Sequence, residues 1–301
     1  MAVSAPVDAN SDDAAPARRQ RSPLWIELLV VAWLCVLYDS ISNDAPLRLQ
    51  AALAHARSIL HVEAILHLHP ELALNHWAAR HAGIALQLSD FYDIAHFVVT
   101  LGLVAVLWFW FPRIYPPLRN TLVLINVIGF VVFWLYPLAP PRMLPSAGFV
   151  DLVAVTHAWG SWRVGALASQ ANELAAMPSL HIAWAVWSAL AAWRILKGRW
   201  WRGVVFTYPG MTAIAVMATA NHYFLDVVAG VATIAAAYWL AKMLGQAMQR
   251  PKPQAALLTV RSQLSRTASW GRQRLSDRRP PPVDADPVLS GSPGRGPNPR
   301  P

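Results

Sequence analysis

The sequence predicts an all-α, polytopic membrane protein, a six-transmembrane-helix bundle with disordered cytoplasmic tails. Two observations support this prediction. First, 55% of the 301 residues are hydrophobic and 14% are charged, whereas a soluble domain carries about 25% charged residues. Second, the apolar residues gather in six runs, each close to the roughly 20 residues that a helix needs to cross a bilayer.

Composition divides the chain into five segments. Residues 1–22 and 246–301 are rich in Pro, Ser, Arg and Asp and cannot bury a core, so both are expected to be disordered tails. Residues 23–44 form the first transmembrane helix, because no convincing signal-peptide cleavage site follows the apolar run. Residues 45–88 mix helically spaced apolar residues with Arg and His, which indicates an interfacial helical region on the outer face. Residues 89–245 form the membrane-embedded core, with runs at about 91–111, 118–137, 180–196, 203–220 and 223–241.

Basic residues predict the orientation of the helices. They cluster before the first run, in two short loops and after the last run (Arg18, Arg19, Arg21, Arg113, Arg119, Lys197, Arg199, Arg202, Lys242, Arg250 and Lys252). If every run crosses, these clusters fall on one side, which the positive-inside rule makes cytoplasmic. We therefore expect a multi-pass protein, in a bacterial cell membrane, with both termini cytoplasmic. The net charge of +9 then reflects orientation and anionic lipid, with no nucleic-acid partner.

A histidine and an aspartate lie at the start of the last run. His222 and Asp226 are four residues apart, so their side chains share one helix face. A carboxylate that binds one ring nitrogen of an imidazole fixes the tautomer and leaves the other nitrogen as a nucleophile. The simpler alternative is a salt-bridged histidine at an interfacial helix end. Under the predicted topology this pair lies on the outer side of the membrane.

Two further stretches reach the same outer side. In Pro178-Ser179-Leu180-His181, Ser179 is a candidate N-cap, and the free amides of a helix start bind anions. His181 is a candidate general acid, although a capped helix with a snorkelling histidine is the simpler alternative. Arg142 follows two prolines and could hold phosphate oxygens, or it could face lipid headgroups. Arg163 is a weaker second cation.

Three motifs follow one another in the core: Pro140-Pro141-Arg142, Ala176-Met177-Pro178-Ser179-Leu180-His181 and Asn221-His222-Tyr223-Phe224-Leu225-Asp226. Over about residues 89–241 they resemble the type 2 phosphatidic acid phosphatase superfamily, and most closely its inositol phosphorylceramide synthase-like branch. The resemblance implies a six-helix membrane fold that needs no metal. It also implies that His222 is the nucleophile, forming a phosphohistidine, that Asp226 orients it, and that His181 is the acid. Arg142 and Ser179 are then the candidate phosphate-binding residues.

The resemblance leads us to expect a lipid phosphatase or phosphotransferase that acts at the outer membrane face. Its substrate would be a phospholipid or a polyprenyl-phosphate-type lipid, and its acceptor water or an alcohol such as inositol. The phosphatase pattern has Lys where this chain has Leu135 and Arg where it has Val216, which favours transfer over hydrolysis. The alternative from another class is a non-enzymatic transporter or proton relay, because ionisable residues within spans often carry protons.

Histidines in the interfacial segment suggest a metal site at first sight (His55, His61, His67, His69 and His76). Only Glu63 and Glu71 could add carboxylate ligands there, and the single cysteine, Cys35, lies within an apolar run. Because metal coordination demands a closely defined ligand geometry, we expect no metal and no cofactor. Asp90, Asp93 and His96 open a span on the outer side, where they could line the headgroup pocket, although an interfacial helix start is the simpler expectation.

Overall fold

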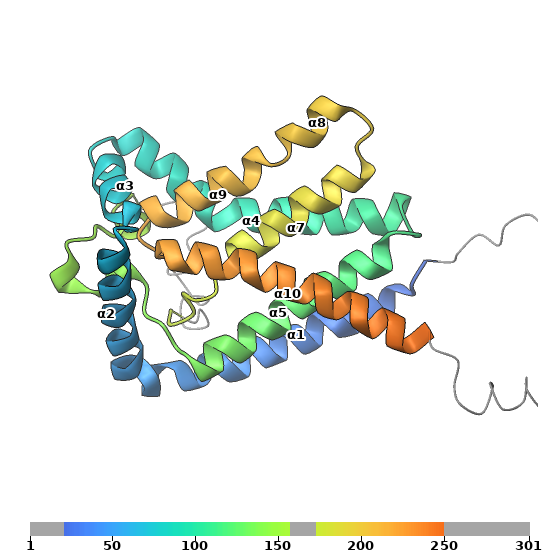
Figure 1. The fold of residues 1–301 in the computed structure, drawn as a ribbon, viewed down its shortest axis with the longest axis horizontal. Helices are drawn as coiled ribbons and strands as arrows, with labels where there is room; N and C mark the ends of the chain where they lie inside the picture. The colour runs from blue at the N-terminus through green and yellow to red at the C-terminus, as the bar shows by residue number, and fades with distance from the viewer. Residues whose placement is uncertain (1–20, 157–172, 250–301) are drawn as a thin grey trace, which may run out of the picture. The chain divides into compact units, whose positions relative to one another are not determined.

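A computed structural model describes residues 21–156 and 173–249. Within these ranges the chain forms helices and loops, with no β-strand beyond an isolated bridge between Leu138 and Ala175 (Figure 1). The predicted all-α architecture is therefore confirmed. Most of the predicted tails, 1–22 and 246–301, lie outside the described residues, as does Arg163.

The α-helices are, in chain order, α1 (Leu24–Asp44), α2 (Leu49–Leu66), α3 (Pro70–Ala79), α4 (Ala82–Trp110), α5 (Tyr115–Leu135), α6 (Leu152–Thr156), α7 (Leu180–Ile195), α8 (Arg199–Val204), α9 (Thr207–Ala218) and α10 (Phe224–Gln249). Short 3-10 helices cover Ala45–Arg48, Pro141–Met143 and Pro145–Ala147. The predicted interfacial segment therefore consists of α2, α3 and the first turns of α4. Helix α4 begins at Ala82 and not near residue 91, because no proline or glycine pair interrupts the sequence between them.

Four helices are long and apolar enough to cross a membrane: Leu24–Asn43, Ala82–Trp110, Tyr115–Leu135 and Phe224–Ala247. The chain is an integral membrane protein. The other two predicted spans are shorter, since α7 has 16 residues and α9 has 12, against the roughly 20 of a full crossing. The run predicted at 203–220 is divided between the end of α8 and α9, with the break at Val205 and Phe206. The count of six spans stays a prediction.

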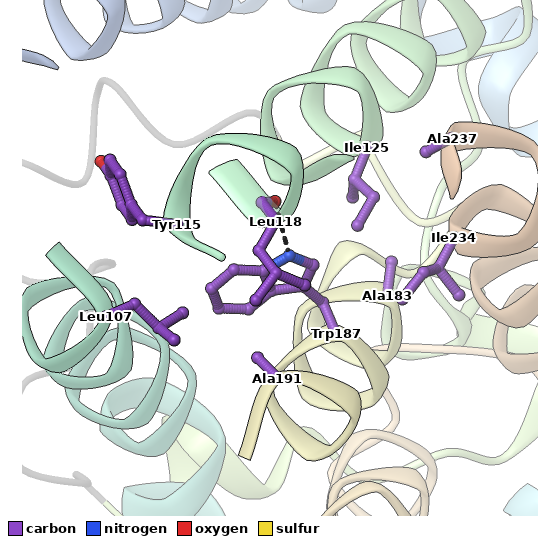
Figure 2. Close-up of a cluster of buried hydrophobic side chains, with 9 residues drawn as sticks. All are labelled: Leu107, Tyr115, Leu118, Ile125, Ala183, Trp187, Ala191, Ile234 and Ala237. Atoms are coloured by element: carbon purple, nitrogen blue, oxygen red, sulfur yellow. Dashed lines mark hydrogen bonds between the residues drawn. The ribbon is translucent and has the colours of Figure 1, made fainter. Parts of the chain in front are cut away.

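Helix α7 packs against α4, α5 and α9. Its Trp187 is 1% exposed, and its indole N–H donates a hydrogen bond of 2.9 Å to the backbone carbonyl of Leu118 in α5 (Figure 2). The buried cluster around this contact combines large and small side chains (Leu107, Tyr115, Leu118, Ile125, Ala183, Trp187, Ala191, Ile234 and Ala237). The alanines let neighbouring helices approach closely, as small residues do in membrane bundles.

The start of α7 and the first turns of α10 touch backbone to backbone. A Cβ added to Gly230 of α10 would lie 2.6 Å from the Ser179 carbonyl oxygen and 3.0 Å from Cβ of Ile182. Next to this contact, the Ser179 N–H donates to the backbone carbonyl of Asp226 at 3.1 Å. Only glycine permits so close an approach, and the contact holds the two predicted histidine motifs together.

Helices α2 and α3 lie at the end of the bundle where α10 begins (Figure 1). Helix α3 packs against α4 and α9. Its buried Asn75 donates hydrogen bonds to the carbonyls of Val150, at 2.8 Å, and Ala218, at 2.7 Å, and accepts one from the Val150 N–H at 2.8 Å. One amide side chain thus joins α3 to the loop before α6 and to the end of α9.

The loop that follows α5 is bound to the segment that leads into α7. The Leu138 N–H donates to the carbonyl of Leu174 at 2.9 Å, and the Ala176 N–H donates to the carbonyl of Leu138 at 3.2 Å. These two bonds satisfy buried backbone groups of an irregular region. They also bring the loop that carries Arg142 beside the motif that carries His181.

Candidate active site

His222 lies in the tight turn between α9 and α10 and is 4% exposed. Its Nδ1 is 2.8 Å from the backbone carbonyl oxygen of Ala176 and 3.4 Å from Oδ2 of Asp226. A carbonyl oxygen can only accept a hydrogen bond, so Nδ1 carries the proton. The neutral ring therefore has its lone pair on Nε2, the arrangement that a nucleophilic or basic imidazole requires.

Asp226 is the third residue of α10 and is fully buried. Besides the His222 contact, its Oδ2 accepts a hydrogen bond of 3.0 Å from the N–H of Tyr223, the residue before the helix. This bond from the third helical residue back to the cap position is half of a capping box. Asp226 therefore orients His222 directly and also holds the turn that presents it.

The turn before α10 is tied down by its backbone. The N–H groups of Asn221 and His222 both donate to the carbonyl oxygen of Val216, each at 3.1 Å. Ala220 has a φ of 56°, in the left-handed region that the chain needs to reverse here. Val216 stands where the phosphatase pattern has an arginine. Its side chain is fully buried, so this position serves packing and supplies a carbonyl to the turn.

His181 is the second residue of α7 and faces His222, with 5.6 Å between the ring centroids. On its other side it stacks on Tyr92 at 4.5 Å and meets the edge of His96 at 4.3 Å. Both residues belong to α4. His96 is thus in the middle of α4 beside His181, and not at an interfacial helix start. This position is closer to the alternative expectation, in which His96 lines the headgroup pocket. Nothing in the sequence pattern pairs it with His181.

Ser179 is the N-cap residue of α7 and is fully buried. Its own N–H is taken by the Asp226 carbonyl, and its side-chain hydroxyl makes no hydrogen bond within the described residues. Ser179 therefore connects α7 to α10 rather than presenting its own amide. The amides of Leu180 and His181, in the first turn of α7, have no acceptor within the helix. They are the amides that an anion could reach.

Arg142 is bound to the same turn as His222. Its backbone N–H donates to the carbonyl of Ala220 at 3.1 Å, and its Nη1 donates to Oδ1 of Asn221 at 2.5 Å. Two acids face the guanidinium as well: Asp151 Oδ2 is 3.5 Å from Nε, and Glu173 Oε1 is 3.7 Å from Nη2. Arg142 thus binds Asn221, the residue directly before His222 in the chain. Sequence reasoning missed these two acidic partners, because no periodic spacing links either of them to Arg142.

Three of the histidines outside the site contact backbone carbonyls. His55 Nδ1 is 2.8 Å from the Pro137 carbonyl oxygen, His76 Nε2 is 2.8 Å from that of Gly148, and His81 Nδ1 is 2.8 Å from that of Trp77. Over residues 21–156 and 173–249, no three His, Cys, Asp or Glu side chains gather in a way that could hold a metal ion.

Two positions lack the cations of the phosphatase pattern. Leu135 ends α5 and is 62% exposed on the apolar surface, and Val216 is buried as described above. Arg142 and the first-turn amides of α7 are therefore the candidate phosphate-binding groups of this arrangement. Two neighbouring imidazoles and a guanidinium within one small region are the groups that displacement at phosphorus would require.

Comparison with known proteins gives one match. Neither a search of curated proteins nor a search of solved structures found a similar chain. The family model described as the PAP2 superfamily matches residues 57–240, a range that contains Arg142, His181, His222 and Asp226 and covers more than half of the chain. The chain belongs to the PAP2 superfamily.

Proposed function

We propose that this protein is a membrane lipid phosphatase or phosphotransferase that works through a phosphohistidine. Membership of the PAP2 superfamily supports phosphatase chemistry on a lipid-like substrate. The observation that carries the proposal is the bonding of His222. Its Nδ1 is held by Ala176 and Asp226, which leaves Nε2 for attack, and His181 lies on the neighbouring side with 5.6 Å between ring centroids.

In the first step, Nε2 of His222 attacks phosphorus and forms a P–N bond. The P–O bond to the leaving group breaks, and His181 gives its proton to the departing oxygen. In the second step, water or an alcohol loses its proton to His181 while its oxygen attacks phosphorus. The P–N bond then breaks, which returns His222 to its starting state. Arg142 and the amides of Leu180 and His181 stabilise the charge on the phosphoryl oxygens.

The substrate in this proposal is a phospholipid or a polyprenyl-phosphate-type lipid, and the acceptor is water or an alcohol such as inositol. The chain would cross the membrane six times, through α1, α4, α5, α7, α8 with α9, and α10. Its site would then face outward and both termini the cytoplasm, as the distribution of basic residues suggests. Leu135 and Val216, in place of two cations, favour transfer and the synthase-like branch.

The decisive experiment replaces the nucleophile. We expect purified His222→Ala, in detergent, to lose turnover on a panel of phospholipids and polyprenyl phosphates while its thermal unfolding stays close to wild type. His61→Ala is the matched control, because His61 is exposed on α2. Wild type given lipid labelled in the phosphate should form an acid-labile protein adduct that His222→Ala lacks. Full turnover by His222→Ala would overturn the proposal.

A second experiment separates transfer from hydrolysis. Labelled lipid phosphate is supplied with and without inositol or another alcohol, and the products are separated. A labelled phospho-alcohol supports the transferase. Free phosphate as the sole product, whatever alcohol is present, excludes transfer and leaves the hydrolase.

One observation favours a different candidate, a proton relay. The rings of His96, His181 and His222 form a row, with centroid separations of 4.3 Å and 5.6 Å, that ends at Asp226. Intramembrane ionisable groups in such rows can conduct protons. Proton flux into liposomes that Asp226→Asn abolishes, with no phosphoryl chemistry on any lipid, would reject the enzyme and support the relay.

A further inference from the structure

Two glutamates outside the three motifs are fully buried beside the start of α10. Glu63 comes from α2 and Glu71 from the first turn of α3, and each is 0% exposed. Glu63 Oε1 accepts a hydrogen bond of 2.7 Å from the backbone N–H of Leu225. Leu225 is the second residue of α10, so this bond occupies an amide that no carbonyl of the helix can reach.

The remaining carboxyl oxygens need an explanation. Glu63 Oε2 and both oxygens of Glu71 are buried and make no well-formed hydrogen bond within the described residues. The two carboxyl groups interact with each other, and Glu71 also lies close to the N–H of Phe224. Leaving three buried oxygens unpaired is costly. One proton placed between the two carboxyl groups supplies a donor and removes a repulsion between like charges.

The electrostatic surroundings favour that proton. Burial raises the pKa of Glu63 to about 9, and the neighbouring charges of Glu71 and Asp226 act in the same direction. Burial also raises the pKa of Glu71, and this effect exceeds the opposing effects of hydrogen bonding to its own N–H and to Glu63 and of the nearby His69. Two close carboxyl groups titrate as one coupled pair. A pair with one shared proton keeps a single negative charge, which suits the positive end of the α10 dipole.

We propose that Glu63 and Glu71 form a proton-sharing carboxyl pair that positions the first turn of α10, and with it His222 and Asp226. The pair touches no reacting atom, so both are positioning residues. Asp226 follows Leu225 directly, and its bonds to Tyr223 and His222 hold the nucleophile. Release of the Leu225 amide would let this turn shift. The effect on catalysis rests on the proposed function, whereas the effect on α10 does not.

The test compares Glu63→Leu with Glu63→Gln. Leucine removes the acceptor for the Leu225 N–H and leaves the buried Glu71 without its carboxyl partner. Glutamine keeps an oxygen for Leu225 and offers its NH₂ to Glu71, as a protonated Glu63 would. Because a shift of about 1 Å at a reacting group can cost about 100-fold, we expect Glu63→Leu to lower kcat by about 10- to 100-fold with KM changed less than about twofold. Glu63→Gln should stay within about threefold of wild type, and Gln50→Leu, exposed on the same helix, should match wild type.

A measurement that does not depend on activity accompanies the kinetics. Hydrogen–deuterium exchange of residues 221–228 should be about tenfold faster in Glu63→Leu and unchanged in Glu63→Gln. Wild-type activity and exchange in Glu63→Leu would overturn the proposal. Equal impairment of Glu63→Gln and Glu63→Leu would also overturn it, since an ionised carboxylate would then be required.

Infrared spectroscopy covers the case in which Glu63→Leu does not fold. In an ester-free detergent at neutral pH, wild type should show a protonated carboxylic acid band that the Glu63→Gln, Glu71→Gln double variant lacks. No such band in wild type would refute the shared proton. Should no variant or wild type show phosphoryl chemistry, the proposed function fails, while exchange and infrared data still report on the pair.

Discussion

Replacing Gly230 by alanine should separate the two halves of the candidate site. The new Cβ would lie 2.6 Å from the Ser179 carbonyl oxygen, and ordinary contact begins at 3.4 Å, so the helices must move apart by about 0.8 Å. The obstacle is backbone rather than a flexible side chain, so no rotamer change relieves it. Overpacking of this kind costs about 1–3 kcal/mol in the free energy of unfolding.

The same shift acts on the chemistry. Ser179 precedes His181 by two residues, and its N–H binds the carbonyl of Asp226. Moving α7 away from α10 therefore moves the proposed acid, His181, away from the proposed nucleophile, His222. A misplacement near 1 Å costs about 100-fold in rate. We therefore expect Gly230→Ala to lose about 10- to 100-fold in turnover of a lipid phosphate in detergent, together with earlier thermal unfolding.

Gly245→Ala provides the control within α10, because nothing lies within 4 Å of its added Cβ. This change should leave turnover unaltered and stabilise the helix by up to about 1 kcal/mol. If Gly230→Ala and Gly245→Ala turned over substrate equally fast, the close α7–α10 contact would have no role in aligning the site, and the reasoning would be refuted.

Three further predictions concern separate parts of the molecule. His181→Gln should lower the turnover of lipid esters at least about tenfold more than that of p-nitrophenyl phosphate, because an alkoxide leaving group needs a proton from a general acid. Equal slowing of both substrates in steady-state assays would show that His181 is not the acid. Because the pKa of Glu63 is raised from 4.5 to about 9 by burial, the folded protein binds more protons than the unfolded protein between these values, so its stability falls as pH rises through this window. Measured by thermal unfolding, the stability of Glu63→Gln should fall less steeply with rising pH than that of wild type. Identical pH dependence in Glu63→Gln and wild type would contradict the raised pKa of Glu63. Trp187→Phe removes the donor to the Leu118 carbonyl and leaves a cavity, so the free energy of unfolding should drop by about 1–3 kcal/mol. An unchanged denaturation midpoint would show that the hydrogen bond from the indole N–H is dispensable.

The local features of this protein could be predicted from its sequence. Apolar runs of helical length indicate membrane helices because a lipid environment demands satisfied backbone groups, and four of the six predicted spans are helices of sufficient length and hydropathy. The spacing of His222 and Asp226 predicted that the two side chains meet, and they do, at 3.4 Å. The predicted reason, a shared helix face, was wrong, because α10 begins at Phe224 and His222 lies in the turn before it. The early start of α4 and the shortness of α7 and α9 were missed, since helix ends depend on packing as well as on composition.

The sequence by itself determined the helical character, the membrane location and the motifs that carry the candidate chemistry. Only the tertiary structure decided which atoms meet. The Ala176 carbonyl binds His222 across 46 positions of the chain, and Glu63 binds Leu225 across 162. The Ser179 amide goes to Asp226 rather than to an anion. Such partners are set by how α2, α7 and α10 pack, and a hydrogen bond between distant segments leaves no periodic trace in the sequence from which it could be read.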